Sequence, residues 1–182
     1  MNDPYAMPNG VLRNKLGITD HQLLAAAEAD ITRARLVLLA ERPLPGAYDL
    51  GHLQAFHATI FGDIYPWAGE LRTVNIAKRT PFCPVRNLMP YAAEVFGRLA
   101  SSGHLRDLPR QEFVIRLAAL YGDLNVIHPF REGNGRTQRA FAVSGRWHGG
   151  AWEAGGDGRW WCSQQAQAGE WPAVAVRKRR PW

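Results

Sequence analysis

Apolar residues recur at helical spacing in several stretches of the chain. The clearest stretch carries a stripe at intervals of four, three, four and three, formed by Phe113, Leu117, Leu120, Leu124 and Ile127. This spacing places the five side chains on one face of a helix. Pro109 suits the first turn of that helix and Pro129 marks its end. The pattern therefore predicts a core-facing helix between the two prolines.

Three further helices are expected earlier in the chain. Residues 21–41 are rich in Ala and Leu, follow Asp20 as a capping residue and stop before Pro43. A second helix begins at Asp49 and ends near Gly62, and its apolar face is formed by Leu50, Leu53, Phe56, His57 and Ile60. The third helix covers residues 87–101.

Residues 70–86 have a different pattern. Side chains alternate from Leu71 to Ile76, and the sequence KRTP at 78–81 is typical of a turn before Phe82. Alternation followed by a turn predicts a short strand and a hairpin. With a fifth helix expected after residue 133, we predict a mainly α fold, a helical bundle with one short β-hairpin.

Composition limits the protein to one globular domain. The 182 residues are too few for two ordinary domains, and 46% hydrophobic with 21% charged residues is typical of a folded protein. No apolar run approaches the roughly 20 residues of a membrane span, and the N-terminus has no signal-peptide pattern. The two cysteines, Cys83 and Cys162, form no CxxC pair, so we expect a reducing, cytoplasmic setting. The net charge of +6 favours anionic partners.

The last part of the chain differs from the rest. Residues 144–182 hold six of the seven Trp, seven Gly and the sequence RKRR, but no Leu, Ile or Phe. We therefore divide the chain into an N-terminal helical extension (1–48), a core (49–143) and an atypical Gly/Trp-rich basic tail (144–182). The tail leaves open a nucleic-acid-binding function, although a solvated basic segment is the simpler interpretation.

Most of the candidate chemistry lies in the sequence HPFREGNGRTQR at residues 128–139. Gly133 and Gly135 allow a sharp turn with accessible backbone N–H groups. Arg136 and Arg139 share one face if a helix begins there. Glycines at a helix N-terminus with two guanidinium groups beside them favour the binding of a polyphosphate.

A base and a metal ligand stand in the same segment. His128 is suited to accept a proton near neutral pH. Glu132 can hold Mg²⁺, which prefers carboxylate and phosphate oxygens. Alone, His128 would be interpreted as a helix cap, but together these residues indicate phosphoryl or nucleotidyl transfer.

The segment resembles the signature of Fic domain proteins, HxFx(D/E)GNGRxxR, at every defined position, and the resemblance extends over roughly residues 49–143. It implies a mainly helical Fic fold and an enzyme that moves AMP from ATP onto a protein hydroxyl with release of pyrophosphate. His128 would then deprotonate the target hydroxyl, Glu132 would position Mg²⁺, and Phe130 would anchor the loop.

The resemblance also assigns nucleotide-binding residues within the signature, namely Gly133, Asn134, Gly135, Arg136, Thr137 and Arg139. The Gly-Asn-Gly turn would form the anion hole around the α- and β-phosphates. Arg136 would hold the β-phosphate, and Arg139 would reach toward the γ-phosphate.

The expected hairpin resembles the flap of the same family, which aligns a target segment by strand addition. Ile76, Lys78 and Phe82 are the expected target-binding residues of this flap. Lys78 and Arg79 are also expected to contact the nucleotide. Asn125 lies three residues before His128, on the same helical face, and is also expected to contact the nucleotide.

Two features refine the subclass. The related Doc kinases carry Lys at the position of Gly135, so this glycine favours AMP transfer over phosphate transfer. None of the ten Ser and Thr residues has Glu four positions later, as the family's inhibitory helix (S/T)xxxE(G/N) requires, and Thr59 with Asp63 comes nearest. We therefore expect a toxin that lacks its own inhibitory helix. A separate small antitoxin protein would supply that helix and dock near Arg139.

Two functions stay open beside AMP transfer, namely a nucleic-acid-binding module built on the basic tail and a catalytically impaired Fic-like scaffold. After the signature, members of the family continue with a Leu-rich helix, whereas this chain has AFAVSGRWHGGAWEAGG. Our hypothesis is that the tail is an altered or frameshifted C-terminus. Such a tail would weaken adenine binding and leave a catalytically impaired Fic-like scaffold. Other Fic proteins transfer UMP or phosphocholine, which the signature does not distinguish from AMP.

Overall fold

The computed structural model describes residues 3–144. By its internal contacts the chain divides into two units, residues 1–152 and 153–182, and the described residues all belong to the first. The expectations for the tail fall outside the described residues, except at Ser144. Within the described part, no helix combines the length and the apolar character needed to cross a membrane.

The first two helices begin directly after Asp20, the predicted cap, and Asp49, the predicted start of the second helix. Helix α1 spans His21–Glu41, and the carboxylate of Asp20 accepts hydrogen bonds from two backbone N–H groups of its first turn. Helix α2 spans Leu50–Phe61, and Asp49 caps it by accepting from the N–H of His52. These caps satisfy donors that the first turn of a helix leaves without intrahelical partners.

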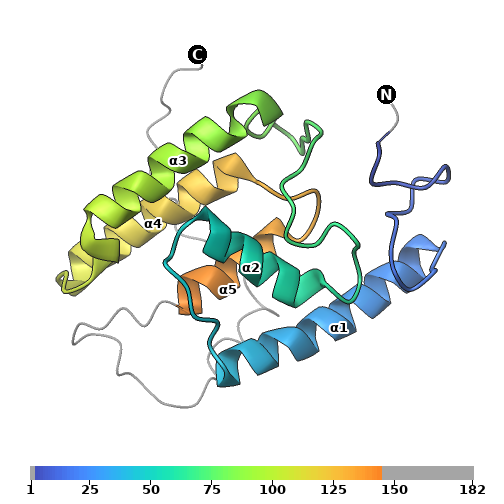
Figure 1. The fold of residues 1–182 in the computed structure, drawn as a ribbon, viewed down its shortest axis with the longest axis horizontal. Coiled ribbons are helices and arrows are strands. Elements are labelled where there is room, and N and C mark those ends of the chain that lie inside the picture. Colours follow the sequence, from blue (N-terminus) through green and yellow to red (C-terminus); the bar gives the residue numbers. More distant parts are fainter. Residues whose placement is uncertain (1–2, 145–182) are drawn as a thin grey trace. The chain divides into compact units, whose positions relative to one another are not determined.

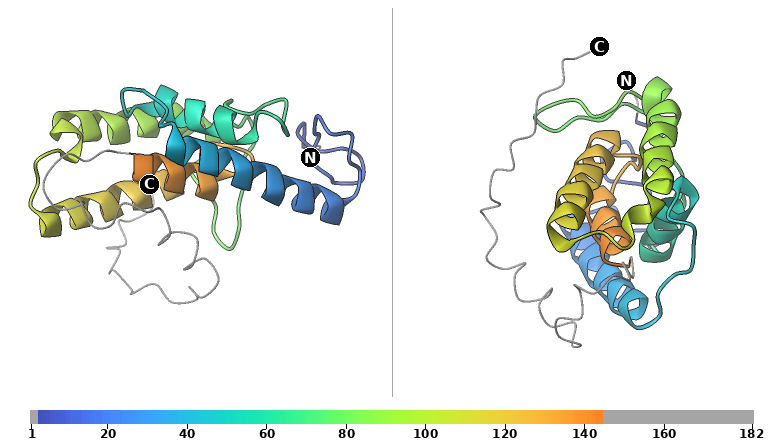
Figure 2. Two further views of the ribbon diagram at one scale, coloured as in Figure 1. Left: turned by 90° about the horizontal axis from the view of Figure 1, so that it is seen from below. Right: turned by 90° about the vertical axis from the view of Figure 1, so that its left-hand side faces the viewer.

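The remaining helices follow the predicted order. They are α3 (Val85–Ser101), the short 3₁₀ helix η1 (Gly103–Leu105), α4 (Arg110–Ile127) and α5 (Asn134–Ser144). Helices α3 and α4 lie side by side, α2 packs against α5, and α1 contacts α2 and α5 (Figures 1 and 2). The signature runs through the loop between α4 and α5 and into the first turns of α5, which packs against α1, α2 and α4.

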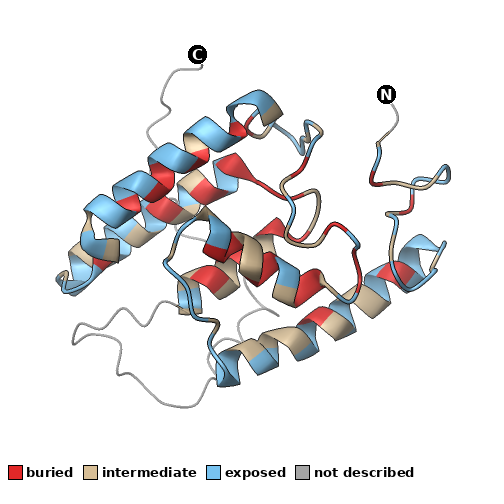
Figure 3. Cartoon of the chain, viewed as in Figure 1, coloured by how far each residue is buried: buried red, intermediate tan, exposed pale blue. Residues whose placement is uncertain are grey.

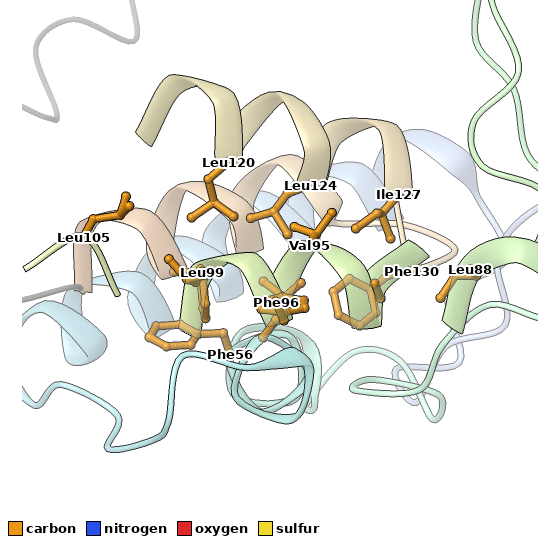
Figure 4. Packing of buried hydrophobic residues seen from close by; sticks show 13 residues of the cluster. Phe56, Leu88, Val95, Phe96, Leu99, Leu105, Leu120, Leu124, Ile127 and Phe130 are labelled. Atoms are coloured by element: carbon orange, nitrogen blue, oxygen red, sulfur yellow. The ribbon is translucent and has the colours of Figure 1, made fainter. Parts of the chain in front are cut away.

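The helices share a core built from their apolar faces. Buried residues lie on the facing sides of the helices, while the outer sides are exposed (Figure 3). In the larger cluster, Phe56 of α2 and Phe96 of α3 pack near Leu124 of α4 (Figure 4). The predicted stripe on α4 is confirmed, since its last three members are buried and the first two are partly buried against this cluster.

The predicted strand and hairpin over residues 70–86 are wrong. The described residues contain no strand there, only an isolated bridge between Ala77 and Pro81. Pro81 and Pro84 have no N–H to donate to a ladder. The carbonyls of Val74 and Cys83 instead accept hydrogen bonds from the side chain of Arg72. The segment is therefore a loop that is held by a side chain.

Candidate active site

His128 is the C-cap of α4 and adopts a left-handed backbone conformation, with φ 44° and ψ 62°. Such a conformation is costly for a residue other than glycine, so neighbouring bonds must hold it. The backbone N–H of His128 donates to Leu124 at 3.0 Å, and its carbonyl accepts from Nε of Arg72 at 2.8 Å. The imidazole is therefore presented at the end of α4 by two backbone contacts.

The imidazole of His128 has a defined tautomer. Its Nδ1 lies 3.3 Å from the carbonyl oxygen of Asn125. Because a carbonyl can only accept, Nδ1 carries the proton and Nε2 keeps its lone pair. Nε2 is therefore the atom that can take a proton from a substrate.

The surroundings keep this imidazole neutral. The ring of Phe82 stacks on it, with 3.7 Å between ring centroids and 13° between planes. Burial lowers the pKa of His128 to about 4. The hydrogen bond with Asn125 opposes this shift, and the charges of Lys78 and Arg72 add smaller effects that lower the pKa further. At neutral pH the group is thus an unprotonated base.

Arg72 links this base to the neighbouring loop and was missed by sequence reasoning. Arg72 is 2% exposed, and its guanidinium donates to the carbonyls of His128, Ile127, Cys83 and Val74. One signal existed, because Arg72 falls on the same side of the alternating segment as Val74 and Ile76. An arginine at such a position indicates a buried cation that binds backbone carbonyls.

The loop between His128 and α5 is closed by its own side chains. Phe130 is 1% exposed, as expected of the anchor. Asn134 is also buried, and its amide accepts from the N–H of Phe130 at 2.8 Å and donates to the carbonyl of Phe130 at 2.7 Å. Asn134 was expected to contact the nucleotide, but its side chain is used to hold the loop in place. Only the backbone N–H of Asn134 is therefore left to face an anion.

Gly133 meets two requirements that only glycine satisfies. Its φ is +80°, and a Cβ atom at this position would lie 2.3 Å from Cζ of Phe61. Directly after it, α5 begins at Asn134. None of the described residues accepts a hydrogen bond from the N–H groups of Asn134, Gly135 or Arg136. The turn therefore presents free donors at a helix N-terminus, which is an arrangement suited to phosphate.

Arg136 is engaged within the protein in this structure. Its guanidinium forms an ion pair with Glu28 of α1, donates to Thr32 at 3.1 Å and lies 4.8 Å from the ring centroid of Phe61. Glu28 also accepts from the hydroxyl of Tyr65. Sequence reasoning missed Glu28, because it lies on α1, outside the segment with the signature.

The two other residues expected at the phosphates differ in their setting. Thr137 is fully buried, and its hydroxyl donates to the carbonyl of Gly133 at 3.1 Å, so it supports the turn from inside. Arg139 is half-buried and forms no ion pair with any residue of the described chain. No carboxylate of residues 3–144 therefore competes with an anion for Arg139.

Glu132 offers a single carboxylate at the mouth of the turn. Its side chain is 45% exposed, and Oε1 accepts from the N–H of Gly133 at 2.8 Å. Within residues 3–144 no group of three or more His, Cys, Asp or Glu forms a metal cage. One carboxylate beside a phosphate site is nevertheless the donor set that Mg²⁺ uses with nucleotides, so Glu132 fits that ion.

The expected flap residues lie along the loop before α3. Lys78 and Arg79 are exposed, and Ile76 is half-buried. Phe82 faces the imidazole of His128, as its ring stacking shows. The side chain of Asn125 is exposed one turn before His128. The predicted roles of these residues toward nucleotide and target stay predictions.

Comparison with known proteins gives consistent matches. The model of the Fic/DOC family matches residues 47–144. The protein adenylyltransferase VbhT of Bartonella schoenbuchensis is 42% identical over 142 residues, which cover 77% of this chain and 30% of that protein. A probable protein adenylyltransferase, Fic, of Salmonella typhimurium is 40% identical over 141 residues, which cover 76% of this chain and 70% of that protein. The chain thus spans less than a third of VbhT but most of the Salmonella protein.

Two solved structures resemble the fold and contain nucleotides. The Fic domain of a putative cell filamentation protein from Bartonella quintana, with bound ADP, has a TM-score of 0.71 and 29% identity, covering 77% of this chain and 73% of that one. BepC of Bartonella tribocorum, with bound AMPPNP, has a TM-score of 0.70 and 25% identity, covering 77% of this chain and 75% of that one. The mainly helical architecture is therefore that of proteins that bind adenine nucleotides.

Proposed function

The chain belongs to the Fic/DOC family and is related to protein adenylyltransferases, and from this premise we propose that it transfers AMP from ATP to a hydroxyl side chain of a target protein. One observation carries the proposal. A neutral imidazole with a free Nε2 stands beside a glycine turn that presents unpartnered N–H groups at a helix N-terminus. A base and an anion site in this order are what nucleotidyl transfer to a hydroxyl requires.

The reaction follows from the placement of these groups. Nε2 of His128 accepts the proton of the target hydroxyl as its oxygen forms a bond to the α-phosphorus. The bond between that phosphorus and the oxygen bridging to the β-phosphate breaks, and pyrophosphate leaves with the electron pair. The N–H groups at the start of α5 stabilise the charge that develops on the phosphate oxygens.

Other residues of the site hold the reactants. Glu132 would hold Mg²⁺, which when bound neutralises charge on the phosphates. Arg139, which is free of internal ion pairs within the described chain, reaches the distal phosphate. Arg136 either leaves its ion pair with Glu28 and binds the β-phosphate, or keeps this ion pair and stabilises the turn from the side of α1. The loop of Ile76, Lys78 and Phe82 receives the target segment.

Labelled ATP tests this function directly. The protein is incubated with Mg²⁺, cell lysate and ATP that carries the label in either the α- or the γ-phosphate. A parallel reaction with His128→Ala gives the background from kinases of the lysate. Above this background we expect protein-bound label from α-labelled ATP and none from γ-labelled ATP, because the α-phosphate stays with the target. Label above this background from the γ-position alone would mean phosphate transfer. No label from either position would refute AMP transfer and leave a Fic-like scaffold or transfer from a donor other than ATP.

We further propose that a small antitoxin protein inhibits the chain in trans, as in toxin–antitoxin pairs. The support is Arg139, a cation beside the phosphate site that no described residue pairs. A partner carboxylate at this position would exclude the γ-phosphate. We expect Arg139→Ala to raise the inhibition constant of the partner at least tenfold, measured at ATP concentrations that saturate each variant because Arg139 also reaches the distal phosphate. Arg110→Ala, at the exposed start of α4, should keep the wild-type inhibition constant. Equal inhibition of both variants, measured by AMP transfer, would disprove docking at Arg139.

A further inference from the structure

His57 is a buried histidine of α2 that contacts the signature loop from behind. It is fully buried, and its ring stacks on that of Phe130 with 3.9 Å between centroids and 17° between planes. Its Nδ1 lies 2.8 Å from the backbone nitrogen of Gly69, and its Nε2 lies 3.0 Å from the carbonyl oxygen of Glu132. Both ring nitrogens are therefore used by backbone groups.

These two contacts define the tautomer of His57. The N–H of Gly69 can only donate, so Nδ1 of His57 is the acceptor and carries no proton. Nε2 must then carry the proton and donate it to the carbonyl of Glu132. Burial lowers the pKa of His57 to about 4, so the ring stays neutral at pH 7. The Glu132 bond opposes this shift, and the charge of Arg136 adds a smaller effect that lowers the pKa.

The carbonyl of Glu132 belongs to the same peptide unit as the N–H of Gly133. A trans peptide is planar, so its C=O and N–H point in opposite directions, and the described chain has no cis peptide bond. With the carbonyl held toward α2, the N–H of Gly133 must point away from the core. It does so in the structure, where it donates to Oε1 of Glu132 at 2.8 Å.

This orientation needs an external restraint. A peptide next to glycine can rotate at low cost, because glycine populates positive and negative φ with similar ease. A rotated Glu132–Gly133 peptide would turn its carbonyl oxygen toward the phosphates and its N–H toward the core. The following peptide is restrained in a similar way, since the carbonyl of Gly133 accepts from the N–H and the hydroxyl of Thr137.

We propose that His57 is a positioning residue, which orients the Glu132–Gly133 peptide so that its N–H faces the nucleotide phosphates. This inference rests on the proposed function for its substrate, ATP, but concerns a residue outside the signature loop. His57 does not touch the substrate and acts through the backbone of Glu132 and Gly133.

Two substitutions separate the two hydrogen bonds of His57. The amide of Gln reaches as far as Nε2, so His57→Gln keeps a donor for the Glu132 carbonyl. The amide of Asn reaches only as far as Nδ1, so His57→Asn keeps the bond with Gly69 and loses the bond to Glu132. We expect His57→Asn to bind a non-hydrolysable ATP analogue at least tenfold more weakly in calorimetry, with kcat/KM lowered by a similar factor. His57→Gln should stay within about threefold of the wild-type value.

His52 provides a matched control on the same helix. It is buried as well, its Nδ1 accepts from the N–H of Tyr48 at 3.2 Å, and its Nε2 lies 3.0 Å from the carbonyl of Leu44. These bonds hold the connection between α1 and α2, not the signature loop. His52→Asn and His52→Gln should therefore lose stability without a difference in affinity for the analogue. If the two His57 variants lose affinity equally, or if the His52 pair shows the same split, the proposal is wrong.

A further variant covers the case in which His57→Asn does not fold. His57→Leu removes both bonds but keeps an apolar side chain beside Phe130, and it should bind the analogue as weakly as expected for His57→Asn. If neither variant folds while His57→Gln does, the Glu132 bond maintains the fold and does not orient the peptide, which overturns the proposal. A wild-type protein that binds the analogue but transfers no AMP would refute the proposed function and leave this comparison valid.

Discussion

Arg72→Met is expected to lower the free energy of unfolding by about 3 to 5 kcal/mol, which is a large part of the stability of a domain of this size. The substitution keeps an apolar stem in the core but removes every donor. The carbonyls of His128, Ile127, Cys83 and Val74 would then lose the hydrogen bonds that the guanidinium now provides. Buried acceptors without partners carry their full desolvation cost. Urea denaturation at pH 7.5 measures the loss.

Arg98→Met is the control that distinguishes an effect of burial from an effect of charge. Arg98 forms ion pairs with Glu94 at 2.6 Å and Asp123 at 2.5 Å, but its side chain is 53% exposed. Exposed ion pairs contribute about 0 to 1 kcal/mol, so Arg98→Met should change the unfolding free energy by less than about 1 kcal/mol. Similar losses in the two variants would contradict the role given to Arg72. Arg72→Lys should fall between wild type and Arg72→Met, because an ammonium cannot reach all four carbonyls.

The parts of the fold that the sequence predicts are those decided by neighbouring residues. Asp20 and Asp49 mark the starts of α1 and α2 because a cap binds N–H groups within three residues. The stripe that ends at Ile127 identifies α4 because its members share one face. These signals act within a single helix, so they can be recognised without knowledge of how the helices pack.

The parts that could not be predicted depend on residues far apart in the chain. Arg72 and His128 are 56 positions apart, and Arg136 and Glu28 are 108 positions apart. The alternation around Arg72 indicated a strand, but the side chain of Arg72 takes carbonyls that a second strand would need. Only the packing of the helices brings such partners together, so they cannot be predicted from the spacing of residues along the sequence.

The candidate site combines both kinds of information. The segment from His128 to Arg139 supplies the base, the glycine turn and the guanidinium groups within twelve positions. Their orientation comes from elsewhere, because Arg72 holds the backbone of His128 and α1 holds Arg136. A sequence motif therefore predicts the chemistry of this site, whereas its geometry depends on residues outside the motif.

His128→Ala is expected to lower kcat for AMP transfer by about 10³-fold, within the range that a general base contributes. The variant loses the Nε2 lone pair but keeps the turn and the start of α5, so the affinity for a non-hydrolysable ATP analogue should change by less than about threefold. Because the base must be unprotonated, the rate falls as the pH drops through its pKa. With the pKa of His128 at about 4, kcat/KM should stay constant from pH 7.5 down to about 5 and decline only below that.

Phe82→Ala tests the cause of this pH dependence. Its ring covers one face of the imidazole at 3.7 Å, and its removal admits water that favours the charged form of His128. The pKa of His128 then rises toward its ordinary value, and the decline of kcat/KM should begin at higher pH than in the wild type. Since Phe82 is also expected to contact the target, only the pH at which the rate declines is compared, and not its maximum. His21→Ala, at the exposed start of α1, should leave both the rate and its pH dependence unchanged.

A His128→Ala protein that transfers AMP at the wild-type rate, or a wild-type decline centred near pH 6.5, would show that this imidazole is not the base in the environment described.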